Sequence, residues 1–400
     1  MKEANKFLVL ACLYTAQTIP GHFATNAMPV IMRSAGFSLE AIGLTGLVSL
    51  PWALKFLWAP LVDRFGGKTR HYGKWIITCQ VLFALLSLAA SYFSLGSDLQ
   101  TLLALMTISY ALAATQDVAV DAFAVRVLSP HERAMGNGVQ TAGNLAGIVL
   151  GSSGALALYY LTSWQSTLVV MGIVILLLGL PVIPAAEPAK TSPHKAGWGD
   201  LLSFFKMPGA VRWIPVMLPV FAGIFSAMAM CKPLLLDLGF QWQTISRLLG
   251  LMPLLGVPAA VLSGICIKRW GAAKIFMLGA LIAVLTCLNL AAASFPASSR
   301  AMVVWALAGI YISFAIISTV LNTVAMSLAR LGREGTDFTA FLSLAFLGGM
   351  IAMGLSGMIA QRFGYAFLFA MCAGLCLLPV VVFTCLNRKG RASYHKLMPG

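Results

Sequence analysis

Long apolar runs separated by short polar breaks follow one another along the whole chain. A membrane-spanning helix needs about 20 mainly apolar residues, and each run reaches or approaches that length. The pattern therefore predicts an all-α membrane protein with twelve transmembrane helices. The predicted spans are residues 7–31, 41–62, 75–94, 99–128, 135–160, 167–185, 213–236, 247–267, 275–293, 301–329, 338–360 and 367–386.

The first apolar run has a second interpretation, because Lys2 and Lys6 precede it as basic residues precede the core of a secretory signal. No clean small-residue cleavage site follows the run, and apolar sequence continues through "GHFATNAMPVIM" (21–32). We therefore expect this segment to remain in the protein and to span the membrane.

Composition and charge agree with a membrane protein. Of the 400 residues, 60% are hydrophobic and 10% charged, with a mean hydropathy of +0.89, whereas a soluble protein carries about 25% charged residues. Most of the 27 Lys and Arg fall in the loops that are cytoplasmic if the N-terminus is inside, so the positive-inside rule predicts that both termini are cytoplasmic. The same dispersal over many loops explains the net charge of +15 without nucleic acid binding. Six basic residues lie outside the predicted cytoplasmic loops: Arg33, Lys232, Arg247, Arg300 and Arg362 in external segments, and Lys55 within a span.

Similar polar loop sequences recur at corresponding positions in the two halves of the chain. "APLVDRFGGKTR" (59–70) follows the second span and "GICIKRWGAAK" (264–274) follows the eighth, each with a small residue, a charge, an Arg, an aromatic residue and a Gly in the same order. Parallel repeats of six spans are typical of two-lobed transporters. We expect lobes at 1–185 and 213–400, the second including a cytoplasmic tail, joined by a cytoplasmic linker at 186–212. Within this linker "WGDLLSFFKM" (198–207) has the spacing of an amphipathic interfacial helix.

The segment "LVDRFGGKTR" resembles the loop signature of the major facilitator superfamily between the second and third spans. The matching residues are Asp63, Arg64, Gly66, Lys68 and Arg70. Ala59 stands where the signature has a leading Gly, and Gly67 where it has a basic residue. The resemblance implies a latch that holds one conformation of the lobe. Because Lys268 replaces the acid in the second copy, we expect Glu334 and Asp337 of "GREGTD" to supply acidic groups there.

Two longer stretches narrow the resemblance. "SLPWALKFLWAPLVDR" (49–64) and "QDVAVDAFAVRVLSPHER" (116–133) are similar to the group of anhydromuropeptide permeases, acetyl-CoA transporters and rhizobactin/pyochelin-type siderophore importers. Muropeptide permeases commonly have longer chains with extra spans, so the compact length favours the siderophore branch. The resemblance thus implies a proton-coupled importer of a siderophore, as its iron complex, in the bacterial inner membrane. The alternative is a permease for an anhydromuropeptide or another anionic organic solute such as an acyl-CoA.

Three charged residues stand inside predicted spans. Asp117 and Asp121 share a helix face at i,i+4, and Lys55 in the second span has a similar predicted depth. Such charges are costly in a membrane and are expected to pair. We expect an ion-pair cluster in which one aspartate carries the coupling proton, with a static structural ion pair as the alternative. Arg126, near the end of the same helix, is interpreted as a cytoplasmic anchor rather than as a partner of Asp121.

Other intramembrane polar residues are candidate solute contacts. The first span carries a polar stripe around the helix-breaking Pro20-Gly21 pair, and the fifth begins with polar residues beside glycines at 143, 147 and 151, whose period favours close helix packing. The candidates are Tyr14, Gln17, His22, Asn26, Gln140, Asn144, Lys232 and Tyr311. Simpler roles remain open for several of them, namely interhelical hydrogen bonds for His22, Gln140 and Asn144 and interfacial snorkelling for Lys232.

Other functional classes lack support in the sequence. The eight cysteines show no metal-ligand spacing and are expected to be buried small side chains; no cofactor or metal is predicted. A phosphate loop of the form GxxxxGK[ST] is absent, so ATP drive is not expected. A lone intramembrane His22 with distant acids does not make an enzyme site. The expected partners are a small solute, protons and the lipid bilayer, with the protein acting as a monomer.

Overall fold

The computed structural model describes residues 3–38, 44–65, 71–185, 187–188, 194–295 and 300–388, and all regular secondary structure in these ranges is helical. This confirms the all-α fold. The chain divides into two compact units. The first unit comprises Met1–Ser129, Gly143–Leu201 and Ala329–Thr339, and the second Pro130–Ala142, Leu202–Leu328 and Ala340–Gly400. These units differ from the predicted lobes at 1–185 and 213–400 in two short segments. Residues 130–142 belong to the second unit, and residues 329–339 belong to the first.

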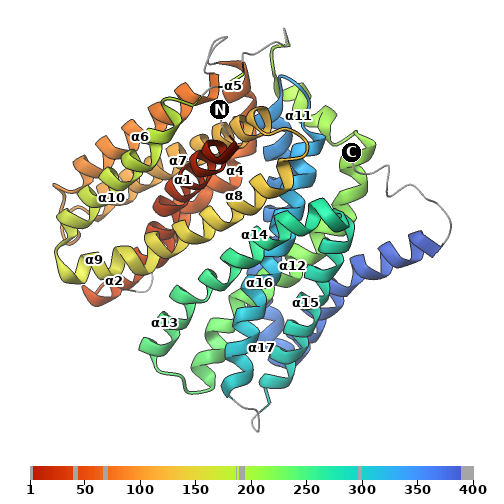
Figure 1. Ribbon diagram of the computed structural model, residues 1–400. Coiled ribbons are helices and arrows are strands. Elements are labelled where there is room, and N and C mark those ends of the chain that lie inside the picture. The colour runs from red at the N-terminus through yellow and green to blue at the C-terminus, as the bar shows by residue number, and fades with distance from the viewer. Residues whose placement is uncertain are drawn as a thin grey trace. The chain divides into compact units, whose positions relative to one another are not determined.

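The first unit begins with a broken helix, α1 (Glu3–His22), the π-helical turn η1 (Phe23–Ala27) and α2 (Met28–Ser34). Pro20 inside α1 and Pro29 at the start of α2 each lack a backbone N–H, which weakens regular i→i−4 bonding between them. Helices α6 (His71–Ala90), α7 (Leu99–Val127) and α10 (Trp164–Gly179) of this unit lie side by side in Figure 1. Helix α8 (Arg133–Val149), η4 (Leu150–Gly154) and α9 (Ala155–Leu161) follow one another between α7 and α10.

The predicted second span, 41–62, is not one continuous helix. Its described part consists of η2 (Leu44–Ser49), α4 (Leu50–Leu54), η3 (Lys55–Leu57) and α5 (Ala59–Arg64). Proline stands in the first turn of both α4 and α5, where it fits a helix start but blocks continuation of the preceding helix. The break places Lys55 at the start of a short 3₁₀ turn.

The second unit contains α12 (Pro208–Asp237), α13 (Trp242–Leu251), α14 (Pro253–Trp270), α15 (Ala272–Ala293) and α16 (Arg300–Leu328). The predicted eighth span, 247–267, is divided between α13 and α14 at Pro253. Helix α17 (Glu334–Arg388) starts in the first unit and continues through the second. Short elements η5 (Leu180–Val182) and α11 (Trp198–Phe204) lie between α10 and α12.

Nine helical segments within the described residues are long and apolar enough to cross a membrane. One of them, Glu334–Val381, has 48 residues, about 72 Å of helix at 1.5 Å per residue, whereas the hydrocarbon core is about 30 Å thick. Its helical path is interrupted at Gly364, where φ is 82°, a conformation that glycine adopts readily. This segment therefore corresponds to two spans, and the two broken spans 41–62 and 247–267 complete the predicted twelve.

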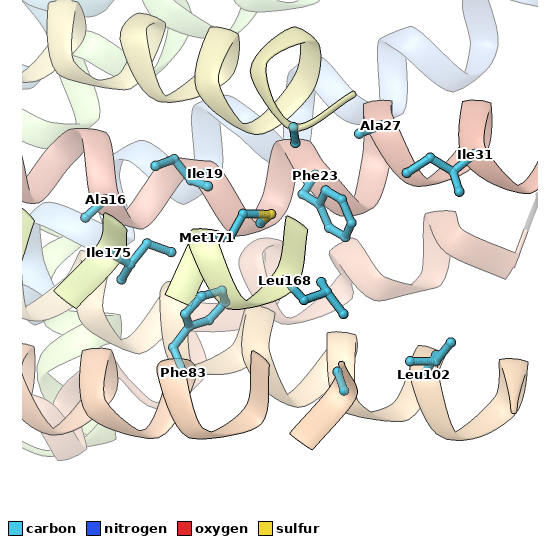
Figure 2. Packing of buried hydrophobic residues seen from close by; sticks show 12 residues of the cluster. Ala16, Ile19, Phe23, Ala27, Ile31, Phe83, Leu102, Leu168, Met171 and Ile175 are labelled. Atoms are coloured by element: carbon cyan, nitrogen blue, oxygen red, sulfur yellow. The ribbon is translucent and has the colours of Figure 1, made fainter. Parts of the chain in front are cut away.

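An apolar layer holds α1 in place within the first unit. Figure 2 shows side chains of α1, α6, α7 and α10 gathered in this layer, among them Ile19, Phe83, Leu102 and Met171. Each of these four is at most 6% exposed. Because lipid is as apolar as these side chains, close van der Waals packing rather than the hydrophobic effect supports this arrangement in a membrane.

Candidate functional site: a buried charge cluster and a terminal polar network

Close backbone contact fixes α1 against α8 and η4. A Cβ built on Gly147 would lie 2.6 Å from the Thr15 carbonyl oxygen, and one on Gly151 would lie 2.4 Å from the Ile19 carbonyl oxygen. No other residue type fits these contacts without displacement of a helix. The expected role of the glycine series in close packing is confirmed, and it fixes the face of α1 that carries Tyr14 and Gln17.

The three intramembrane charges lie together in the first unit. The Lys55 ammonium group forms an ion pair with Asp117 Oδ2, and the amide nitrogen of Gln17 donates to Asp117 Oδ1 at 2.5 Å. One turn further along α7, Asp121 Oδ1 accepts a hydrogen bond from the Tyr14 hydroxyl at 2.9 Å. All five residues are buried. The cluster thus contains two carboxyl groups and one ammonium group shielded from water.

Aromatic rings complete the surroundings of Lys55. Its Nζ atom lies 4.2 Å from the centroid of the Trp52 ring, a distance at which the ring face attracts a cation. Trp52 stacks on Tyr110 with centroids 5.5 Å apart. A Cβ on Gly21 would lie 2.3 Å from Tyr110 Cε2, so glycine at the break in α1 leaves the space that this ring occupies. No spacing of residues in the sequence indicated that Trp52 and Tyr110 would be in contact.

The remaining candidates of the first unit form separate pairs. Thr18 Oγ1 donates to Asn144 Oδ1 at 3.0 Å, and the Asn26 amide nitrogen lies 2.9 Å from His22 Nδ1. His22 and Asn26 are both partly exposed beside η1. The predicted stripe is therefore divided, because Tyr14 and Gln17 bind the aspartates whereas His22 and Asn26 bind each other.

Three candidates, Gln140, Lys232 and Tyr311, belong to the second unit. Gln140 is buried, Tyr311 is partly buried in α16, and Lys232 is exposed near the end of α12.

Asp63 of the predicted latch binds the N-terminus of α17. Its carboxylate accepts hydrogen bonds from the backbone nitrogens of Gly335 (3.0 Å) and Thr336 (2.7 Å), and from Thr336 Oγ1 (2.6 Å). The first N–H groups of a helix lack intrahelical partners and favour negative charge, so a carboxylate suits this position. Burial raises the pKa of Asp63, while the hydrogen bonds from Thr336 and Tyr72 lower it. Arg64 is exposed, and Gly66, Lys68 and Arg70 lie outside the described residues.

Arg126 is not a simple anchor at the membrane surface. Its guanidinium pairs with Glu187 at 3.2 Å and with Glu334 at 3.3 Å, and it lies 4.5 Å from the centre of the Tyr72 ring. All three charged side chains are at most 7% exposed. The anchor interpretation is wrong because it considered only the residue's own helix, whereas the two acids come from the linker and from α17.

Glu187 and Tyr72 were not recognised from the sequence. Glu187 also accepts hydrogen bonds from the backbone nitrogens of Tyr72 and Gly73 at the start of α6, and the Tyr72 hydroxyl lies 2.7 Å from Asp63 Oδ1 and 3.1 Å from Glu334 Oε2. The network therefore joins the ends of α5, α6, α7 and α17. The only signal in the sequence was that acidic residues stand near the start of a helix. The spacing of the paired residues along the chain follows no helical period, so it did not indicate which groups would meet.

A second ion-pair group attaches the linker to residues 330–337. Arg330 binds Asp337 at 2.7 Å and the Asp200 carbonyl at 2.9 Å, and Asp200 pairs with Arg333 at 3.1 Å. The hydrogen bond to Asp337 raises the pKa of Arg330. Of the segment 198–207 expected to form an amphipathic helix, Trp198–Phe204 forms the short helix α11, and its Trp198 indole donates to the Leu57 carbonyl at 2.7 Å. Glu334 and Asp337, expected to supply acids to the second copy of the loop, instead bind groups of the first unit: Glu334 binds Arg126 and Tyr72, and Asp337 binds Arg330.

The described residues include no group of three or more His, Cys, Asp or Glu side chains arranged to hold a metal ion. The buried carboxyl groups of the first unit can bind protons, and the ion pairs described above can break and form.

Comparisons with known proteins agree with this architecture. The chain is 27% identical over 92% of its length to a Haemophilus influenzae protein described as uncharacterised, of which it covers 92%. It is also 27% identical to the anhydromuropeptide permease of Escherichia coli K12 over 65% of this chain, but this match spans only 55% of the permease. The solved structure of the proton:xylose symporter XylE superposes with a TM-score of 0.72 over 95% of both chains, at 11% identity, which supports the fold alone.

The sequence profile described as Major Facilitator Superfamily matches residues 7–353, most of the chain. Together with the helical fold and the repeated loop signature, this match shows that the protein is a multi-pass membrane transporter belonging to the major facilitator superfamily.

Proposed function

We propose that this transporter imports an anhydromuropeptide, or a related polar organic anion, across the bacterial inner membrane in symport with protons. The name of the E. coli relative supports this substrate class over the siderophore first expected from the compact chain. The relatives described above provide no specific support for siderophore import. The match to about half of the permease leaves the identity of the solute to experiment.

The observation that carries the proton coupling is the composition of the buried cluster. Lys55 forms an ion pair with Asp117, and the Gln17 amide donates a hydrogen bond to the same carboxylate. Asp121 accepts a hydrogen bond from the neutral Tyr14 hydroxyl. With both aspartates ionised the three charges sum to −1, and one proton makes the cluster neutral. Because a net charge away from water is costly, we assign the coupling proton to Asp121.

The latch residues would control the conformational cycle. Asp63 holds the start of α17 through three hydrogen bonds, and Arg126 holds Glu334 in the same segment. Both contacts break if residues 334–336 move away from α5 and α7. In the proposed orientation, with both termini in the cytoplasm, these contacts lie at the cytoplasmic ends of the helices. Arg64, Gly66, Lys68 and Arg70 complete the proposed latch by resemblance.

Among the candidate solute contacts, His22 and Asn26 are the best supported. They are partly exposed beside the π-helical turn η1, and such turns often occur at functional sites. Tyr14 and Gln17 act instead on the aspartates. Asn144, Gln140, Lys232 and Tyr311 remain proposed contacts, and a monomer remains the proposed functional state.

Uptake into proteoliposomes tests the proposal. Purified protein would be reconstituted with an imposed inward proton gradient, and uptake of a labelled anhydromuropeptide, a ferric siderophore and acetyl-CoA would be compared. We expect gradient-dependent uptake of the anhydromuropeptide that a protonophore abolishes. Uptake of the siderophore alone would reject the substrate assignment, and uptake unaffected by the protonophore would reject proton coupling. Asp98→Asn, at a partly exposed position before α7, is the matched control for aspartate variants.

A further inference from the structure

Arg133, the first residue of α8, is a partly buried cation of the second unit. Its Nε–H group is buried and donates to no acceptor in the described part of the chain, and the ion pairs found there do not include this side chain. Arginine is seldom buried unless it is paired, because a charge that loses water needs compensation. An anion from outside the chain would supply that compensation.

Arg333 provides a comparison in the other half of the chain. It stands directly before α17, as Arg133 stands at the start of α8. The Arg333 guanidinium pairs with the Asp200 carboxylate at 3.1 Å. An arginine at the start of the helix is therefore compensated by an acid of the protein in one half, whereas the described residues provide no such acid in the other.

Two glycines bring the first turns of α8 into close contact with α14. A Cβ on Gly138 would lie 2.7 Å from the Ala260 carbonyl oxygen, and a Cβ on Gly264 would lie 2.5 Å from the Ala134 carbonyl oxygen. A step of four residues back along α8 thus matches a step of four residues forward along α14. The two helices are therefore antiparallel here, and the start of α8 lies beside the C-terminal turns of α14.

The part of α14 that reaches Arg133 carries an exposed apolar strip with a basic end. Continued by one residue, the antiparallel pairing places Arg133 at the level of Ile265. Leu262, Ile265 and Arg269 share one face of α14, since they are three and four residues apart. Leu262 is 58% and Ile265 51% exposed, and Lys268 and Arg269 in the last turn are exposed too. Three cations therefore stand near one end of an exposed apolar surface.

We propose that Arg133, Lys268 and Arg269 bind the phosphate group of an anionic phospholipid, whose acyl chain lies along Leu262 and Ile265. A guanidinium group presents a planar fork that donates to two phosphate oxygens, and a lysine adds a compact point charge. Basic pockets between membrane helices bind the headgroups of anionic lipids in this way. The lipid phosphate would supply the counter-charge for Arg133.

A lipid headgroup and a free phosphate ion offer the same oxygen ligands to these cations. The exposed strip at Leu262 and Ile265 favours the lipid, because a free phosphate gains nothing from an apolar surface. In the proposed orientation the site lies at the cytoplasmic ends of α8 and α14, where the membrane surface is negatively charged. The choice of leaflet rests on the proposed function, whereas the binding of an anionic lipid does not.

Lipid titration followed by native mass spectrometry tests the site. Purified full-length protein in detergent would be titrated with phosphatidylglycerol, which is anionic, or with phosphatidylcholine, which has no net charge. We expect wild type to bind phosphatidylglycerol more tightly than phosphatidylcholine, and Arg133→Gln to bind phosphatidylglycerol about fivefold more weakly than wild type. Equal affinity of wild type for the two lipids, or an unchanged affinity in Arg133→Gln, would overturn the proposal.

Thermal unfolding in vesicles separates lipid binding from packing. In phosphatidylcholine, Arg133→Gln should be at least as stable as wild type, because it removes a buried charge without a partner. In a mixture of phosphatidylcholine and phosphatidylglycerol, wild type should be the more stable of the two. An equal loss of stability in both kinds of vesicle would show that the arginine acts only by packing.

Arg212→Gln is the matched control. Arg212 is exposed near the start of α12 in the same unit, so the variant loses the same charge and should bind phosphatidylglycerol as wild type does. An equal loss in both variants would indicate general attraction by net charge and reject the site. Sodium phosphate that stabilises wild type in phosphatidylcholine as much as phosphatidylglycerol does would reject the lipid as the source of the phosphate. These measurements involve no transport, so failure of the proposed function leaves their result intact.

Discussion

Lys55 and Asp117, 62 residues apart in sequence, form a buried ion pair, with side chains 8% and 6% exposed. Neither charge is stable alone in this environment, because an isolated buried ion loses its hydration without compensation. The pair therefore links the broken second span to α7, and it accounts for one of the two aspartates in an otherwise apolar helix. Removal of one partner should therefore leave the other charge buried without compensation.

Lys55→Met is expected to destabilise the protein by about 3–5 kcal/mol, because it leaves the Asp117 charge buried without its cation. The double variant Lys55→Met/Asp117→Asn should recover much of this loss, since both charges are then absent. Thermal unfolding in detergent measures both effects. Lys206→Met, at an exposed position, is the control. A double variant no more stable than Lys55→Met would contradict the ion-pair explanation.

Asp121→Asn is expected to abolish proton-driven uptake while preserving exchange of the solute across the membrane. The amide still accepts a hydrogen bond from Tyr14, so the helix contact is retained, but it cannot bind and release a proton. Counterflow of labelled solute without a proton gradient measures exchange, and uptake under a gradient measures coupling. Retention of gradient-driven accumulation would assign the proton to another group.

Thr336→Val removes one hydrogen bond to the buried Asp63 carboxylate and should cost about 1.5–3 kcal/mol at neutral pH. This hydrogen bond lowers the pKa of Asp63, so its contribution is present when Asp63 is ionised. It is lost as the pH falls through the pKa of Asp63 in the folded state. The difference between wild type and variant should therefore shrink on acidification. Thermal unfolding across pH 4–7 measures it, a range that extends upward from the usual aspartate pKa of about 4 because burial raises the pKa of Asp63 overall.

Thr339→Val provides the matched control on the same helix. Thr339 is equally buried at 1% exposure, and its hydroxyl has no hydrogen-bond partner among the described residues. We expect this substitution to leave stability unchanged or to raise it slightly, with no dependence on pH. Equal losses for both variants would indicate that packing, rather than the bond to Asp63, determines the effect.

Arg126→Gln is expected to destabilise the protein by about 3–5 kcal/mol, because Glu187 and Glu334 then remain buried without their cation. Adding Glu187→Gln and Glu334→Gln should restore part of the stability by removing both charges. Unfolding midpoints of the single and triple variants decide the question. If the triple variant is less stable than Arg126→Gln, neutral hydrogen bonding rather than charge compensation dominates this network.

Gly151→Ala should destabilise the first unit by about 1–3 kcal/mol through overpacking, because the new Cβ would lie 2.4 Å from the Ile19 carbonyl oxygen. Gly154→Ala, three residues later in the same π-helical turn, would place its Cβ no closer than 3.5 Å to another atom. We expect this control to be neutral or stabilising. Unfolding midpoints compare the two, and similar losses would show that backbone freedom rather than contact with α1 requires glycine here.

By itself, the sequence determined the membrane environment and the number of spans, and it predicted that Lys55 pairs with an acid of α7. These follow from local composition, from the length of apolar runs and from the high cost of an isolated charge in lipid, none of which requires knowledge of distant contacts. The pattern of apolar residues could not reveal the broken path of residues 44–64, because hydropathy measures polarity along the chain and not backbone geometry.

Only the tertiary structure decided which polar groups meet. From its position on α7 alone, Arg126 was interpreted as a cytoplasmic anchor, yet it forms ion pairs with acids from the linker and from α17. The physical reason is that helix periodicity fixes which side chains share a face, whereas the choice of neighbouring face depends on close packing at particular residues, such as Gly151 against α1 and Gly223 against α17.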